Sequence, residues 1–165
     1  MNIEIRQDDP LTYEGGGFVV PTNSYAQMVE GWAARIKEVG GEAIESEAMK
    51  SAPIAVGAAI STSAGSLLLT RLIHVPFSEH PGVRIGIENV RRATRAALLA
   101  AQHFQLDRIC IPGFGYGENG IPYDETARAI IDELKAFKGP HPSHVTLMDT
   151  DDAMIQAFRA QVEEH

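Results

Sequence analysis

The chain has 165 residues, of which 44% are hydrophobic and 22% charged, and its formal net charge is −8. We expect a single domain over residues 1–165, because this length and composition allow one hydrophobic core. The acidic balance, without a run of lysine or arginine, argues against binding to nucleic acid or an anionic membrane, since both require a basic face. A small phosphorylated ligand remains compatible with it, because backbone N–H groups can supply positive potential.

Segments that direct export or membrane insertion are not recognisable. No apolar run approaches the roughly 20 residues of a membrane-spanning helix, and the N-terminal residues lack the basic-then-apolar pattern of a signal peptide. We therefore expect a cytoplasmic protein. The six histidines are scattered and the one cysteine, Cys110, lies in a predicted strand, so we expect a buried thiol, no metal site and no cofactor.

Short apolar runs alternate with longer amphipathic segments along the chain, which predicts an α/β domain. Strands are expected at Asn2–Arg6, Gly17–Pro21, Val56–Ser61, Thr70–Val75, Asp107–Ile111 and His144–Met148. Helices are expected at Ala26–Val39, Glu42–Lys50, Ile85–Phe104, Asp124–Phe137 and Asp151–Glu163. On the helix over Ile85–Phe104, the arginines lie opposite the apolar stripe, which favours a solvated face for them.

The segment Gly113–Pro122 contains four glycines between a predicted strand and a predicted helix. Glycine loses much backbone entropy on folding, so such a loop indicates a close approach of the backbone to a ligand, most commonly a phosphate. Residues 115–120 fit the G-x-G-x-x-G pattern, but a dinucleotide fingerprint belongs to the first βα unit and has its helix starting inside the motif. Here Pro122 places the helix start after the last glycine. The alternative is a structural turn.

The predicted strand Gly17–Pro21 continues into Thr22-Asn23-Ser24. In an open α/β sheet, ligands bind at the carboxyl ends of the strands. Asn23 offers two donors and an acceptor at such an end. The alternative interpretation is a cap for the helix expected from Ala26, with Ser24 as a competitor for that role.

Taken together, these pieces resemble a macrodomain, the ADP-ribose-binding module whose relatives include enzymes that process ADP-ribose-1-phosphate and O-acetyl-ADP-ribose. The resemblance covers roughly Ile3 to Phe158 and rests on the order of its segments: Asp9, Pro21-Thr22-Asn23, Gly31-Trp32-Ala33-Ala34-Arg35-Ile36 leading to Gly40-Gly41, Leu72-Ile73-His74, Ile87–Phe104 and Gly113–Pro122. It implies a three-layer α/β/α sandwich around a mixed, mostly parallel sheet of about six strands.

The resemblance also implies roles for individual residues. Asp9 would accept a hydrogen bond from the adenine amino group, and the segment around Met148 and Asp149 would lie near the adenine. Asn23 would contact the distal ribose, and Gly31 and Trp32 would line the first loop beside that ribose and the diphosphate. The second loop would wrap the diphosphate with backbone N–H groups, and its ligand-binding residues would be Gly113, Gly115, Tyr116, Gly117, Glu118 and Asn119. His74 would be structural.

The first glycine loop is degenerate relative to the family pattern. Val29-Glu30 precede a single Gly31, and the first Asn of the family's motif falls on Val20. Ala33 stands where hydrolytic members related to O-acetyl-ADP-ribose deacetylases often carry an Asp. A carboxylate on Glu30 near a diphosphate would be repelled, so Glu30 either points away, binds a ribose hydroxyl or signals a changed ligand.

Three functional hypotheses follow. The leading one is binding of ADP-ribose or a related ADP-ribosyl metabolite, free or attached to a protein, in a cleft between the two loops at the carboxyl edge of the sheet. The second is an ADP-ribosyl hydrolase or O-acetyl-ADP-ribose deacetylase, in which Asn23 positions a water and Glu30 is the general base. The third is a degenerate macrodomain that acts as a protein-interaction or structural module, with Trp32 and Tyr116 filling the cleft.

Overall fold

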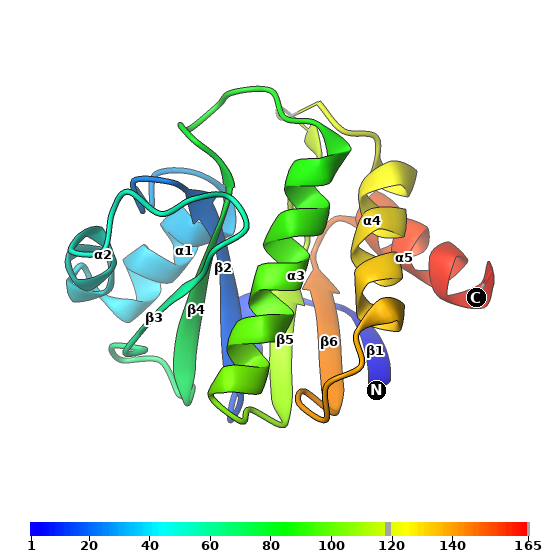
Figure 1. Ribbon diagram of the computed structural model, residues 1–165, viewed down its shortest axis with the longest axis horizontal. Coiled ribbons are helices and arrows are strands. Elements are labelled where there is room, and N and C mark those ends of the chain that lie inside the picture. Colours follow the sequence, from blue (N-terminus) through cyan, green and yellow to red (C-terminus); the bar gives the residue numbers. More distant parts are fainter. Residues whose placement is uncertain (118–119, 165) are drawn as a thin grey trace.

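The computed structural model describes residues 1–117 and 120–164 and forms three layers, with helices on both faces of a central sheet (Figure 1). Among these residues six strands form one sheet in the order β1-β6-β5-β2-β4-β3, and all neighbours are parallel except β3 and β4. The strands are β1 (Asn2–Gln7), β2 (Gly17–Asn23), β3 (Ile60–Thr62), β4 (Arg71–Ser78), β5 (Arg108–Pro112) and β6 (His144–Asp149). This is the expected mixed, mostly parallel architecture.

The helices divide between the two faces because successive side chains of a strand point to opposite sides. Val19 and Ile73 belong to the core beneath α3, α4 and α5, whereas Phe18 and Leu72 belong to the core beneath α1 and α2. Each face is therefore apolar, as a sheet covered on both sides requires. The helices are α1 (Gly31–Gly40), α2 (Ala43–Met49), α3 (Ile87–His103), α4 (Tyr123–Ala136) and α5 (Asp152–Glu164).

Two predicted elements are wrong in their extent. The helix expected from Ala26 begins only at Gly31, because Ala26 has a left-handed backbone with φ 57° and cannot continue a right-handed helix. The strand expected over Val56–Ser61 shrinks to β3, since Gly57 has φ 104° and the chain before Ile60 makes only an isolated bridge. Both errors lie in segments where a residue with positive φ reverses the chain and interrupts the predicted element.

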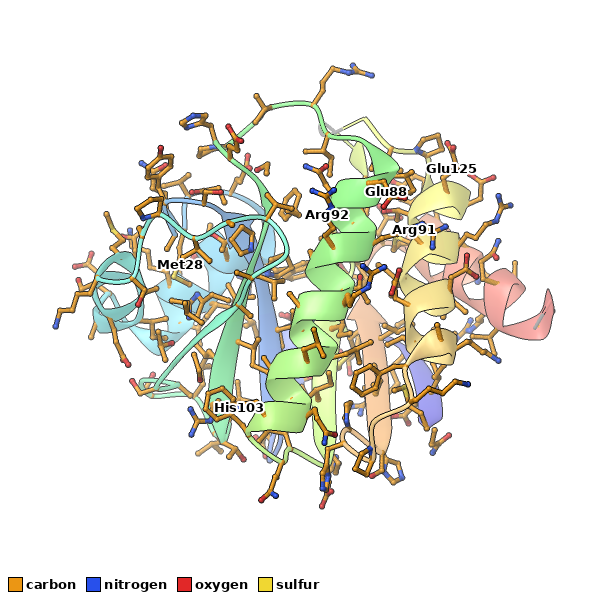
Figure 2. All side chains as sticks on the ribbon, viewed as in Figure 1. Met28, Glu88, Arg91, Arg92, His103 and Glu125 are labelled. Atoms are coloured by element: carbon orange, nitrogen blue, oxygen red, sulfur yellow. The ribbon has the colours of Figure 1, made fainter. Side chains whose placement is uncertain are left out.

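The arginines of α3 lie at the surface, as expected, and two of them form ion pairs there. Figure 2 shows Arg91 between α3 and α4, where its guanidinium lies 3.3 Å from Asp132 and 3.7 Å from Glu88. Arg95 likewise approaches Glu133 of α4 to 2.8 Å. The pairs with Asp132 and Glu133 join α3 to α4 at the surface, where each contributes little stability.

Two side chains expected to be buried are buried. Cys110 is fully enclosed and burial raises the pKa of its thiol, so it is no nucleophile at neutral pH. His74 lies in the sheet with Nε2 at 2.8 Å from Thr62 Oγ1, and burial lowers the pKa of the imidazole to about 4. His74 is therefore neutral and structural.

The strand order places a crevice between β2 and β5. The chain leaves β2 towards β4 on one side, whereas it leaves β5 through α4 towards β6 on the other. Because the two connections diverge, the loops after β2 and β5 leave a gap at the carboxyl edge, which is where open α/β sheets bind ligands. No described helix is long and apolar enough to cross a membrane.

Candidate functional site

A cleft of about 460 Å³ occupies this carboxyl edge. The end of β2, the start of α1, the end of β4 and the segment after β5 line it, through Pro21, Thr22, Asn23, Gln27, Glu30, Gly31, Trp32, Ala33, Arg35, Phe77, Gly113, Phe114, Gly115 and Tyr116. We call residues 24–30 the first loop and residues 113–122 the second loop. Trp32 and Tyr116 form walls of the cleft and leave it open, unlike the filled cleft of the third hypothesis.

Asn23 holds the first loop closed. Its Nδ2 donates to the Gln27 carbonyl at 2.9 Å, and its Oδ1 accepts from the amides of Tyr25 and Gln27 at 3.1 and 3.3 Å. The alternative interpretation, in which Asn23 caps the helix expected from Ala26, is wrong, because α1 begins only at Gly31. The amide of Asn23 has a second N–H for which no acceptor is found among the described residues, and Asn23 lines the cleft.

Glu45 is a second anchor of the first loop that was not predicted from the sequence. From α2, its Oε2 accepts from the Met28 amide at 2.7 Å, while its Oε1 lies 2.9 Å from Lys37 Nζ (Met28 is labelled in Figure 2). Burial alone would raise the pKa of Glu45, but the hydrogen bonds from Lys37 and Met28 outweigh it and hold the pKa below its usual range. No local pattern marks a residue that acts across a helix and a loop.

The start of α1 faces the cleft without a side-chain cap. Glu30 occupies the N-cap position and makes no capping hydrogen bond, and Gly31 follows with φ 58°. The first intrahelical bond runs from the Ala34 amide to the Glu30 carbonyl. The N–H groups of the first turn and the positive end of the helix are thus available to an anion in the cleft, which Gly31, Trp32 and Ala33 line.

Glu30 lines the cleft but points one carboxylate oxygen elsewhere. Its Oε1 accepts from the Gly82 amide at 3.2 Å, in the segment that joins β4 to α3. This geometry matches the first of the three alternatives for Glu30, because the Gly82 amide directs one carboxylate oxygen away from the centre of the site.

The glycines of the second loop have reasons within the protein. A Cβ on Gly113 would collide with Asp149 Oδ2, and one on Gly115 would lie 2.8 Å from Val90 Cγ2. Gly117 has open space around it but adopts φ 77°, which favours glycine. Glu118 and Asn119, both predicted ligand residues, lie outside the described residues. Close packing therefore explains two of the glycines that suggested a ligand.

Tyr116 ties the second loop to the end of β6. Its hydroxyl donates to Asp149 Oδ2 at 2.6 Å, and its ring stacks on Tyr123 with centroids 5.0 Å apart. Burial is the main reason that the pKa of Asp149 is raised, with the Tyr116 hydrogen bond acting against it. Burial and the neighbouring Asp149 also raise the pKa of Tyr116, so the phenol keeps its proton.

Asp9 lies beside the cleft rather than in its lining. It caps the short 3₁₀ helix η1 (Pro10–Thr12) by accepting from the Leu11 amide at 3.0 Å. Its Oδ2 is 3.4 Å from Arg35, which lines the cleft. The Asp8 amide donates to the Asp149 carbonyl at 3.1 Å, so the ends of β1 and β6 meet at this side of the site.

A family model described as Macro domain matches residues 19–130 of the chain. The chain belongs to the macrodomain family. Among sequence relatives, an uncharacterized protein of Aquifex aeolicus is 39% identical over 158 residues, which are 96% of each chain. Another from Aeropyrum pernix is 35% identical over 146 residues, 88% of this chain and 77% of that one.

Solved structures show the same fold at low sequence identity. A Trypanosoma brucei macrodomain in complex with ADP-ribose has a TM-score of 0.87 at 16% identity, covering 98% of this chain and 69% of that chain. An Oceanobacillus iheyensis macrodomain with ADP has a TM-score of 0.82 at 17% identity, covering 98% and 90%. The resemblance stated from the sequence is therefore confirmed at the level of family and fold.

The macrodomain fold brings together most of the residues predicted for the site. Seven of the predicted residues line one cleft: Asn23, Glu30, Gly31, Trp32, Gly113, Gly115 and Tyr116. Asp9 adjoins it through Arg35, and Gly117 lies outside the lining. The cleft is also lined by residues for which no role was predicted, among them Gln27, Arg35 and Phe77. Their place at the carboxyl edge became evident only in the folded structure. Within the described residues, no group of three or more His, Cys, Asp or Glu side chains is arranged to hold a metal ion.

Proposed function

We propose that this macrodomain binds ADP-ribose or a close ADP-ribosyl relative in the cleft between its two loops. The observation that carries the proposal is the uncapped start of α1, which faces the glycine-rich second loop across the cleft. A helix N-terminus and backbone amides can hold a diphosphate without a basic surface, as a protein of net charge −8 requires. The ADP-ribose and ADP complexes of the Trypanosoma brucei and Oceanobacillus iheyensis macrodomains support this choice of ligand.

The proposed ligand lies along the carboxyl edge of the sheet. The adenine lies towards Asp9 and Arg35, at the side where β1 and β6 end. The diphosphate crosses from the start of α1 to the backbone of the second loop. Gly115 and Tyr116 are the residues of that loop that line the cleft at this point. The distal ribose meets Asn23 through the second N–H of its amide. An ADP-ribosylated protein is a ligand under the same proposal.

Binding is preferred over hydrolysis because the two candidate catalytic side chains are already engaged. Asn23 bonds three backbone groups of the first loop, and Glu30 accepts from the Gly82 amide. A general base must reach the attacking water. Hydrolysis by Asn23 and Glu30 remains the alternative, and turnover of ADP-ribosylated protein by wild type and Glu30→Gln decides it: equal rates reject Glu30 as the base.

Two variants of Gly31 test the proposed diphosphate site. Asn and Asp both tolerate positive φ, so Gly31→Asn and Gly31→Asp share the backbone cost and differ by one charge. We expect Asp to weaken ADP-ribose binding about tenfold or more relative to Asn, because a carboxylate in the cleft repels the diphosphate. Isothermal titration calorimetry measures both affinities, with thermal unfolding as the check on folding.

Equal affinity of the two variants for ADP-ribose would exclude a position of the diphosphate at the start of α1. The same pair at Gly117, where a Cβ has open space, maps the other side. If Asp and Asn at Gly117 bind alike while those at Gly31 differ, the phosphates lie closer to the helix than to the tip of the second loop.

A further inference from the structure

A segment that we call the arch, residues 79–86, runs from the end of β4 to the start of α3 and passes above the carboxyl edge of the sheet (Figure 1). Its residues are not part of the cleft lining. The arch nevertheless contacts both loops that form the cleft, and these contacts carry the inference.

On the side of the first loop, two contacts join the loop to the arch, and a third joins it to the end of β4 just before the arch. The Ser24 amide donates to the carbonyl of Ser78, the last residue of β4, at 3.0 Å. The rings of Tyr25 and His80 stack with centroids 5.3 Å apart and 18° between their planes. At the far end of the loop, Glu30 Oε1 accepts from the Gly82 amide at 3.2 Å. The first loop is therefore attached to the arch near both of its ends.

On the side of the second loop, the arch contributes Arg84. Its guanidinium lies against Gly120, where an added Cβ would approach Arg84 Nη2 to 2.9 Å. The arch thus spans from the first loop to the second. A change in the Glu30 contact alters how firmly the start of α1 is held relative to the opposite wall.

Glu30 has a further consequence for an anionic ligand. It is the one acidic residue in the described lining of the cleft, and a carboxylate there opposes a diphosphate. The bond from the Gly82 amide uses one carboxylate oxygen and directs it to the arch. The Glu30–Gly82 hydrogen bond therefore orders the chain immediately before α1 and holds the Glu30 carboxylate towards the arch.

We propose that Glu30 is a positioning residue that clasps the first loop to the arch and slows the release of the bound ligand. The proposal rests on the proposed function, since the ligand is ADP-ribose. In the clasped state, Val29 and Glu30 fix the entrance to the first turn of α1. Loss of the clasp loosens this entrance and weakens the contacts of the bound diphosphate with the first turn of α1, and such losses appear mainly in the dissociation rate.

The experiment compares Glu30→Ala with Glu30→Gln, because glutamine keeps an acceptor for the Gly82 amide and alanine does not. Trp32 is the single tryptophan of the chain and lines the cleft, so its fluorescence reports ADP-ribose binding in stopped flow. We expect alanine to raise the dissociation rate about fivefold, as loss of one hydrogen bond predicts, with an association rate within about twofold of wild type. Glutamine restores slow dissociation. Glu79→Ala, which removes an exposed carboxylate of the arch itself, is the matched control and dissociates like wild type.

Hydrogen exchange of the ligand-free protein separates this proposal from the proposed function. The Gly82 amide should exchange faster in Glu30→Ala than in wild type or Glu30→Gln. Equal exchange in all three, or equal dissociation rates, overturns the clasp. Fast dissociation in both Glu30 variants also overturns it, because the charge and not the hydrogen bond would then matter. If the wild type does not bind ADP-ribose although its Gly82 amide is protected, the proposed function is refuted. The role in release is then refuted too, and the Glu30–Gly82 bond is only a structural contact.

Discussion

The two loops of the cleft are held in place by different means. The first loop takes its shape from side chains outside it: Asn23 and Glu45 bond its backbone, and Glu30 ties its end to the arch. The second loop takes its shape from glycines that pack against neighbours, with Tyr116 as its tether to Asp149. A loop held by side chains of other segments tolerates substitutions of its own residues. A loop that depends on glycines packed against their neighbours does not, because any larger side chain would collide.

This difference explains how a degenerate first loop still lines an open cleft. The residues Val29 and Glu30, which depart from the family pattern, follow the part of the loop that Asn23 and Glu45 fix. The backbone therefore reaches α1 in the geometry that exposes its first turn. In the second loop, by contrast, Gly113 and Gly115 lie where any side chain would meet Asp149 or Val90.

The largest expected effect concerns packing in the second loop. Gly115→Ala combines a positive φ with a Cβ 2.8 Å from Val90 Cγ2 and 3.0 Å from Thr126 Oγ1. We expect a loss of about 2–4 kcal/mol in the free energy of unfolding, measured by urea denaturation. Gly117→Ala, with the same sign of φ and open space, is the control and should lose only about 1 kcal/mol. Equal losses would show that backbone conformation, and not packing, constrains this loop.

Removal of the Asn23 side chain tests the first loop. Asn23→Ala leaves the amides of Tyr25 and Gln27 and the Gln27 carbonyl without their partner in a part-buried loop. We expect a loss of about 2–3 kcal/mol of stability and weaker ADP-ribose binding. Thr22→Val is the control, because Thr22 Oγ1 is a weak donor to the same carbonyl at 3.5 Å. A stable Asn23→Ala protein with an unchanged cleft would mean that Glu45 alone holds the loop.

A smaller effect is expected from the tether of the second loop. Tyr116→Phe removes the hydroxyl donor to Asp149, whose carboxylate stays buried with its bonds from the Asp151 and Thr150 amides. We expect a loss of about 1–2 kcal/mol and a further rise in the pKa of Asp149. Tyr123→Phe removes the donor to Asp151, a carboxylate that is less buried than Asp149, and should cost less. Chemical denaturation gives the stabilities and carboxyl NMR titration gives the pKa; a reversed order would contradict the tether.

The smallest effect concerns the pH dependence of the first loop. Because the pKa of Glu45 is held below its ordinary value in the folded state, its contribution to stability is present at neutral pH. It is lost as the pH falls below the model-peptide range of glutamate and through the folded pKa. Glu45→Gln keeps an acceptor for the Met28 amide and removes the Lys37 ion pair, so it should flatten the acid limb of the stability curve. Urea midpoints measured from pH 7 to pH 3 show this, and parallel curves for wild type and variant would exclude a role for the charge.

Sequence patterns predicted much of the fold and part of the site. Five of the six strands and four of the five helices have nearly the predicted bounds, because apolar periodicity reports which side of an element is buried. Asn23 and the glycines of the second loop were found because strand ends and glycine-rich turns are local signals. Phe77 lines the cleft from β4 and Glu45 holds the first loop from α2, so no local signal defines their contacts. Asp149 was expected near the site only through the resemblance.

The sequence by itself determined the family, the layered α/β architecture and the position of both loops at the carboxyl edge, because each depends on local periodicity or on the order of short motifs. The tertiary structure decided the start of α1, the partner of Glu30 and the reason for each glycine. Those features depend on hydrogen bonds and close contacts between residues distant in the chain, such as Met28 with Glu45 and Glu30 with Gly82. Only the folded topology brings such partners within bonding distance.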